Sequence, residues 1–282
     1  MKKTLVLIVL MMAVLSSCRW FQETPPVGMM LAKHFDKKLY KKFDTAEYNI
    51  VFRKRLDSTS KLFLNPKTFK AYYYSKDFEP VLVTKYFENG GLDSLQNYLE
   101  QSEFHGFSKD NFRYEQLTKA LALLNEGDFK DIGEVYPVLA DLELNAAEAL
   151  VKYHNFIYYG VTNPRKILSK YNIPIKRPDS LAIIKILSTD NIVQLLQGIQ
   201  PASDDYKIFQ RELKSYLDTI SSGERRKTRE ITKAQKRGTA GPSNSASWLV
   251  SIESDSTLNA TGKLATGTNR LKTILVNMER LR

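Results

Sequence analysis

Cysteine and histidine are scarce in this sequence of 282 residues, which contains one cysteine and three histidines. The single cysteine, Cys18, has no partner for a disulfide within the chain. The histidines are His34, His105 and His154, and no two of them have the spacing of a metal-binding motif. We expect His105 to order a helix exit and His154 to face solvent. The sequence therefore predicts no catalytic residue, no metal site and no cofactor.

Long hydrophobic runs are also rare. One run, from Leu5 to Leu15, follows two lysines and is too short to span a bilayer, which is typical of a secretory signal peptide. It ends in Leu15-Ser16-Ser17-Cys18, which resembles the lipobox of bacterial lipoproteins. The resemblance implies that residues 1–17 are a lipoprotein signal peptide and that Cys18 carries the lipid. An ordinary signal peptide with an incidental cysteine is the alternative.

Lipidation of Cys18 would fix the compartment of the protein. Two acyl chains are enough for stable membrane attachment, so we predict a periplasm-facing protein of the cell envelope, anchored by lipid to the inner or the outer membrane. Residues 18–30 include Thr24-Pro25-Pro26 and are predicted to form a short tether.

Acidic residues are outnumbered, and the formal net charge is +11. The excess is concentrated near the end, because residues 221–282 contain twelve Lys and Arg against five Asp and Glu, a net of +7. Export would remove the protein from most nucleic acid, so we predict no nucleic-acid partner. Anionic lipid headgroups or peptidoglycan carboxylates are possible partners, and a solvated basic face without a specific partner is an equal alternative. Protein partners cannot be named from the sequence.

The most clearly marked element lies between Tyr136 and Gly160. Pro137 favours a first helical turn, and Gly160 favours a left-handed C-terminal cap. Apolar residues recur between them at spacings of three and four, and we expect the other side of the helix to carry the polar residues Asp141, Glu143, Glu148 and Lys152. The pattern predicts a long amphipathic helix that needs packing partners.

The remaining segments supply those partners. Residues 29–55 suggest a short helix and then a strand, and residues 77–83 an extended passage. Residues 172–178 are also predicted to be extended, because Pro174 and Pro178 each disfavour a helix at the residue before them. Further helices are predicted to begin near Pro66, Gly91, Tyr114, Lys166, Asp179, Asp190 and Ser203. The fold class is therefore mainly α: a multi-helix scaffold domain, residues 31–220, around a long central helix, with a poorly ordered basic C-terminal segment.

Two tyrosine-rich sets, Tyr72 to Tyr74 and Tyr158 to Tyr159, could line a sugar-binding groove, although we favour packing in the core. Near the end of the chain, Ile274-Leu275-Val276 is predicted to be an orphaned hydrophobic strand. The alternative is a contact of its basic neighbours with wall carboxylates; these neighbours are Arg270, Lys272, Arg280 and Arg282.

Several passages together resemble the large murein L,D-transpeptidases. The matching passages are Tyr72 to Val81, Leu95-x-x-x-Leu99-x-x-Ser102-x-x-His105-Gly106, Tyr136-Pro137-x-Leu139-Ala140, Tyr153 through Tyr159-Gly160-x-x-Asn163-Pro164, and Asn277 to Arg282. The resemblance implies a helical scaffold domain followed by the start of a peptidoglycan-binding-like segment. It also implies a role in peptidoglycan cross-linking.

The chemistry of that family is cysteine acyl transfer, in which a thiolate in a Ser-His-Gly-Cys setting attacks a peptide bond. This sequence has no such motif, and its one cysteine is assigned to the lipid. We therefore predict a truncated scaffold portion that is catalytically inactive alone. Residues 221–257 would be a basic linker or disordered insert, and residues 258–282 a remnant that leads to an absent catalytic domain. A stand-alone lipoprotein that binds peptidoglycan or a protein partner is the alternative.

Overall fold

The computed structural model describes residues 24–161, 178–219, 271, 274–279 and 281–282. The described residues are mainly α-helical and contain no β-strand, which confirms the predicted fold class. The signal peptide, Cys18, the basic linker at 221–257 and the extended passage at 172–177 lie outside the described residues. None of the described helices is long and apolar enough to cross a membrane.

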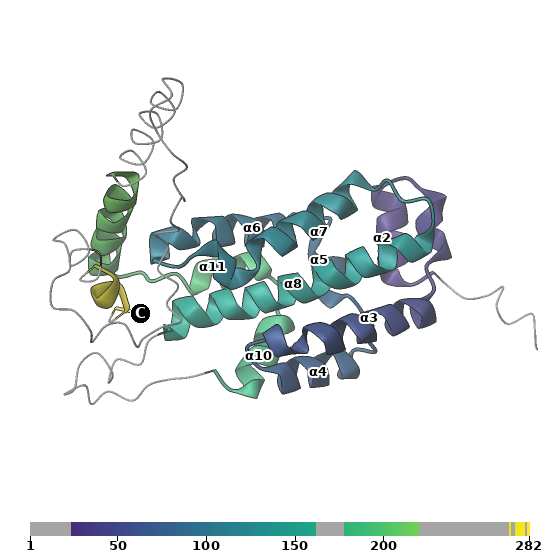
Figure 1. Cartoon of the computed structure of the whole chain (residues 1–282), viewed down its shortest axis with the longest axis horizontal. Coiled ribbons are helices and arrows are strands. Elements are labelled where there is room, and N and C mark those ends of the chain that lie inside the picture. Colours follow the sequence, from purple (N-terminus) through teal and green to yellow (C-terminus); the bar gives the residue numbers. More distant parts are fainter. Residues whose placement is uncertain (1–23, 162–177, 220–270, 272–273, 280) are drawn as a thin grey trace, which may run out of the picture.

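Helix α8 (Ile132–Tyr159) has 28 residues and runs through the middle of the molecule, with α6 and α7 on one side and α3 and α4 on the other (Figure 1). Its start differs from the prediction. Asp131 caps the helix, its carboxylate accepting a hydrogen bond from the Gly133 N–H at 2.8 Å. Pro137 therefore lies inside the helix, where it removes one backbone donor from the second turn.

Neighbouring helices cover α8 around most of its circumference. It packs against α3, α5, α6, α7 and α10, and 0 % of the Glu143 and Glu148 side chains is exposed. Glu143 and Glu148 were predicted on the side of the helix opposite its apolar residues, and the neighbouring helices bury that side as well at these two positions. Asp141 and Lys152 are only half-buried, as expected of that face. The periodicity placed the helix correctly at the centre, but it could not reveal that helices would close over its polar side.

The N-terminal half contains α2 (Pro26–His34), η2 (Lys38–Lys42), α3 (Thr45–Thr59), η3 (Ser60–Leu62), α4 (Pro66–Ser75) and α5 (Val81–Tyr86). Three predictions fail here. The prediction of a tether at residues 18–30 is wrong from Pro26 onward, because helix α2 begins at Pro26 and its Leu31 is buried. The strand in residues 29–55 is wrong, because Asp44 caps a 15-residue helix. The extended passage is wrong from Val81 onward, where α5 begins.

The second half contains α6 (Gly91–Glu100), η4 (Gln101–His105), η5 (Lys109–Phe112), α7 (Tyr114–Glu126), α10 (Ser180–Leu187) and α11 (Ile192–Gly198). A further helix spans residues 204–219. The predicted starts near Gly91, Tyr114 and Asp179 are confirmed, and α11 is capped by Asn191, one residue beyond the expected Asp190. The predicted helix near Lys166 lies outside the described residues.

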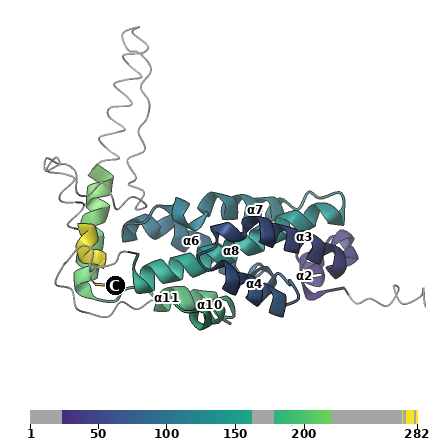
Figure 2. The same cartoon turned by 60° about the horizontal axis from the view of Figure 1, so that its bottom comes forward.

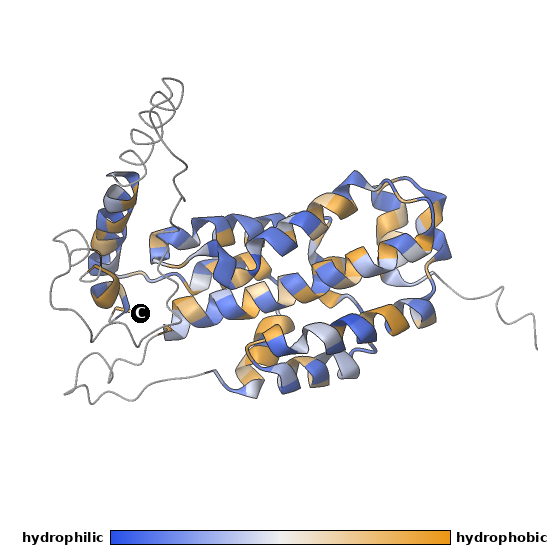
Figure 3. Cartoon of the chain, in the orientation of Figure 1, coloured by the Kyte–Doolittle hydropathy of each residue, from blue (hydrophilic) through white to orange (hydrophobic). Residues whose placement is uncertain are grey.

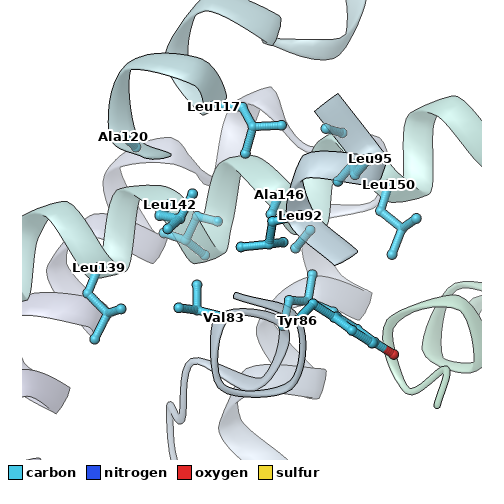
Figure 4. Close-up of a cluster of buried hydrophobic side chains, with 14 of the residues drawn as sticks. Val83, Tyr86, Leu92, Leu95, Leu117, Ala120, Leu139, Leu142, Ala146 and Leu150 are labelled. Atoms are coloured by element: carbon cyan, nitrogen blue, oxygen red, sulfur yellow. The ribbon is translucent and has the colours of Figure 1, made fainter. Parts of the chain in front are cut away.

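The core lies between α8 and its neighbours, where apolar residues recur along each helix (Figure 3). Figure 4 shows Leu139, Leu142, Ala146 and Leu150 of α8 facing side chains from α5, α6 and α7. A second, smaller apolar cluster joins the helix of residues 204–219 to the last residues of the chain. Figures 1 and 2 both place these two segments near the C-terminal end of α8, at the opposite end from α2.

Candidate functional site

The last described residues form a short helix, residues 274–279, that packs against the rest of the protein at the C-terminal end of α8. We call the contact the C-terminal docking site. On one side it comprises the last helix and Arg282. On the other side it comprises His105, Gly106, Phe107, Gly160, Val161 and Tyr206. It joins the last helix to three segments that are distant from one another in the sequence.

Apolar packing provides the base of this site. Ile274 and Met278 are buried beside Tyr206 and Leu213 of the neighbouring helix. Residues 274–279 are helical, and Ile274 and Met278, four positions apart, lie on one face of that helix. The predicted strand at residues 274–276 is therefore wrong. A strand would also have needed a neighbouring strand edge, and the described residues offer none.

Arg282 supplies the polar part of the docking site. Its guanidinium donates one hydrogen bond to the His105 carbonyl and others to the Tyr206 hydroxyl, at 3.3 Å from Nε and 3.2 Å from Nη2. It also lies over the Phe107 ring, 4.3 Å from the ring centroid. The side chain of Arg282 is only 3 % exposed. Its charge is therefore held inside the protein rather than presented to a wall carboxylate.

Glu279 balances that charge and adds a second connection. Its Oε2 pairs with Arg282 Nη1, and its Oε1 accepts a hydrogen bond from the Val161 N–H at 2.7 Å. Glu279 thus connects the last helix to Val161, just beyond the C-terminal end of α8. A buried ion pair is favourable only when its remaining hydrogen-bonding capacity is also used, and here both side chains have such further partners.

Two glycines allow the close approach of the last helix. Gly106 (φ 81°) and Gly160 (φ 72°) both have positive φ, which L-residues rarely adopt. A Cβ atom at Gly106 would collide with the Leu275 side chain, and one at Gly160 would collide with the Glu279 carboxylate. The positive φ expected at Gly160 is confirmed, although its ψ of 173° is not that of a left-handed helical cap. Both positions therefore require glycine for two reasons.

His105 ends η4, as predicted for a residue that orders a helix exit, and it is 6 % exposed. Its Nδ1 lies 2.9 Å from the Tyr206 hydroxyl oxygen. Burial lowers the pKa of His105 to about 4, and the nearby positive charge of Arg282 contributes in the same direction. The imidazole is therefore neutral at physiological pH. The sequence pointed to His105-Gly106 as a helix exit but gave no sign of its distant partner.

The other predicted candidates do not join this site. His154 is half-buried on α8, where burial lowers its pKa, so the expectation of a solvated side chain is only partly met. Tyr72 and Tyr73 pack in the core, as we favoured, and the Tyr72 hydroxyl donates to the Leu187 carbonyl at 3.0 Å. Tyr158 is 50 % exposed at the end of α8. Among the described residues, no group of His, Cys, Asp and Glu could hold a metal.

A second polar cluster, which the sequence did not predict, surrounds Glu143. Its Oε1 accepts hydrogen bonds from the Tyr73 hydroxyl at 2.8 Å and the Leu82 N–H at 3.1 Å, and its Oε2 accepts from the Val83 N–H at 2.9 Å. Glu143 thus satisfies backbone donors in the first turn of α5. Burial raises the pKa of Glu143 to about 7 despite these hydrogen bonds, which favour the ionised form. The role of this cluster is to fix α5 against α8.

Comparison with known proteins places most of these features in one family. The sequence model of the Scaffold domain matches residues 67–213, from the first turn of α4 into the helix of residues 204–219. The chain belongs to the Scaffold domain family. No curated protein and no solved structure matches the sequence. The matched part of the Scaffold domain contains α8, the Glu143 cluster, and both glycines and Tyr206 of the docking site. The last helix lies beyond the match.

Proposed function

We propose that this protein is a cell-envelope lipoprotein in which the Scaffold domain holds the C-terminal helix at a fixed position during L,D-transpeptidase-type peptidoglycan cross-linking. The docking of Arg282 against His105 and Tyr206 carries the proposal. A buried arginine with four protein contacts is costly to release, which suits a positioning role. The Scaffold domain match is compatible with the transpeptidase resemblance, which supplies the reaction class.

The proposed function assigns no catalytic nucleophile to these 282 residues. Acyl transfer in the transpeptidases needs a cysteine thiolate, and the only cysteine in the 282 residues is Cys18. Acylation would consume that thiol. We therefore propose that the 282 residues contribute positioning and no nucleophile. Purified protein incubated with muropeptides should form no 3-3 cross-links, and the appearance of such links would contradict this assignment.

Membrane attachment is the part that is most easily tested in cells. Wild-type protein and the Cys18→Ser variant would be expressed with an alkyne-labelled fatty acid, and the membranes then separated from the soluble fraction. We expect label on the wild-type protein only, and a shift of the variant out of the membrane fraction, because the acyl chains supply the anchor. Equal labelling of the two proteins would refute the lipoprotein assignment.

A stand-alone wall-binding lipoprotein is the second candidate, favoured by the net charge of +11. Basic side chains would be attracted to the carboxylates of the wall, and that attraction weakens as salt screens it. A pulldown on purified sacculi at low and high salt tests this candidate directly. Retention that falls with salt supports it, and no retention at low salt excludes it.

A further inference from the structure

A cleft of about 290 Å³ opens beside the docking site and shares two of its residues, His105 and Tyr206. The cleft lies between the end of α6, the C-terminal part of α8 and the start of the helix of residues 204–219. Its volume is near the lower end of the range for small-molecule sites, so it suits a ligand of about one sugar ring in size.

The polar lining of the cleft is rich in groups that donate hydrogen bonds without carrying charge. Carboxamides come from Gln101, Gln200 and Gln210, and a phenol comes from Tyr153. The Gln200 Nε2 donates to the Tyr153 hydroxyl oxygen at 3.4 Å and to the Leu196 carbonyl at 2.7 Å, and Tyr153 itself is fully buried. The carboxamide donors that remain for a ligand are therefore those of Gln101 and Gln210, while Gln200 offers its oxygen as an acceptor. No Asp or Glu is among the described lining residues.

The hydrogen bonds of the docking site determine which nitrogen of His105 carries the proton. Arg282 can only donate, and its two hydrogen bonds occupy the acceptor positions of the Tyr206 hydroxyl. The Tyr206 proton is then donated to His105 Nδ1, 2.9 Å away. The neutral ring therefore carries its own proton on Nε2. That N–H makes no hydrogen bond to another described residue, so it is the ring donor that His105 offers to the cleft.

The charge and the shape of the cleft narrow the class of ligand. Lys207 is the one charged residue among the described residues that line the cleft, and its ammonium lies 3.6 Å from the carboxylate of Asp204. This part of the cleft therefore has little net charge to offer an ion. The half-buried Tyr98 contributes an aromatic wall, against which a sugar ring can pack. An acetamido group places its N–H donor and its carbonyl acceptor on separate atoms, so it can bind the Gln200 oxygen and the His105 Nε2–H at the same time, whereas a hydroxyl donates and accepts at a single oxygen.

We propose that this cleft binds a neutral acetamido sugar, with the Gln101 and Gln210 carboxamides and the His105 Nε2–H contacting its oxygens and Tyr98 lying against the ring. The choice of ligand rests on the proposed function, because an envelope protein meets such sugars in the cell wall. The predicted groove of Tyr72 and Tyr158 does not provide this site. The tyrosine that lies along the cleft is Tyr98, which the sequence did not suggest for a sugar-binding groove.

Calorimetric titration of the full-length protein with tri-N-acetylchitotriose tests the proposal, and cellotriose, which lacks the acetamido groups, is the matched control ligand. We expect saturable binding of the first sugar and at least about tenfold weaker binding of the second, as the loss of one or two hydrogen bonds predicts. No binding of tri-N-acetylchitotriose, or equal binding of the two sugars, would overturn the proposal.

Substitutions at the rim locate the site. Gln101 is exposed and Gln210 half-buried, so the double variant Gln101→Ala/Gln210→Ala should fold normally, which a thermal melt verifies. We expect its affinity to fall by about tenfold. Gln197→Ala removes an exposed carboxamide of α11 outside the cleft and should leave the affinity unchanged. Equal affinities for the two variants would place the sugar elsewhere and refute the assignment.

Nitrogen-15 NMR of the histidine rings provides a readout that needs no variant. His105 should show the Nε2–H tautomer, and its Nε2 resonance should move on addition of tri-N-acetylchitotriose. An unchanged resonance at saturation would contradict the proposal. The proposed function has separate readouts in the lipid labelling of Cys18 and the cross-linking assay, so a failed sugar titration would leave it standing.

Discussion

Arg282 donates a hydrogen bond to the main-chain carbonyl of His105, although the two residues are 177 positions apart in the sequence. Through this contact the Scaffold domain holds the last helix, residues 274–279. Between these residues lie the long central helix and the helix of residues 204–219, both of which contribute to the same site. One side chain thus connects the exit of η4 with the end of the chain.

Substitution of Arg282 should release the last helix. Arg282→Ala removes hydrogen bonds from a charged donor, each worth about 1.5–3 kcal/mol, together with the ion pair between Arg282 and the Glu279 carboxylate. Hydrogen–deuterium exchange should therefore accelerate in residues 274–282 and change little in the middle of α8. Arg211→Ala, at an exposed position of the neighbouring helix, is the control. Unchanged protection of residues 274–282 in Arg282→Ala would show that the arginine does not hold the helix.

Alanine at Gly160 should destabilise the docked state by two effects. The positive φ costs about 1–3 kcal/mol for a residue with a Cβ, and the methyl group would collide with the Glu279 carboxylate. Urea unfolding and exchange of residues 274–282 would measure the loss. Gly198→Ala is the matched control, because nothing lies within 4 Å of an added Cβ there. That variant should be as stable as the wild type, or more stable by about 0.5–1 kcal/mol. Similar losses at the two positions would argue against the docking contact.

Ionisation of Glu143 should make stability fall as pH rises towards neutrality. Its pKa is raised from 4.5 to about 7 in the folded state, so the folded protein binds more protons than the unfolded chain in that interval. The corresponding contribution is fully present below pH 4.5 and is lost as pH rises through 7, with an upper size of about 3 kcal/mol.

His105 titrates in the opposite sense, because its lowered pKa favours folding as pH rises from about 4 to 6.5. The measurement is therefore the difference in unfolding free energy between wild type and Glu143→Gln, by urea unfolding at several pH values. The glutamine does not titrate, so the contribution of His105 cancels in this difference. We expect the stability of wild type relative to the variant to decrease between pH 5 and 7. A difference that is constant with pH would show that Glu143 is not buried as a titrating group.

Local signals in the sequence predicted much of the fold. Asn65-Pro66 and Asp179 each mark a helix start that the structure contains, because a capping side chain acts within one turn. Helix α5 was missed because a side chain from another helix, Glu143, satisfies its first turn. The sequence of residues 77–83 gives no sign that a carboxylate from another helix accepts these hydrogen bonds.

The passages that form the docking site could be picked out in the sequence one by one, but their contacts with one another could not. The sequence drew attention to His105-Gly106, to Tyr159-Gly160 and to the residues that end in Arg282, but as separate passages. Their convergence depends on how α8 and the helix of residues 204–219 are packed, which spacing along the chain does not encode. The short apolar run at residues 274–276 was likewise ambiguous, because three consecutive apolar residues fit a strand and a helix equally well.

The last helix is docked on the Scaffold domain through Arg282, and arginine side-chain NMR tests this contact most directly. The Arg282 Nε–H, assigned by its loss in Arg282→Lys, should exchange slowly and show nuclear Overhauser effects to the rings of Phe107 and Tyr206, since the guanidinium lies 4.3 Å from the Phe107 ring centroid. A rapidly exchanging Nε–H without contacts to either ring would contradict the account.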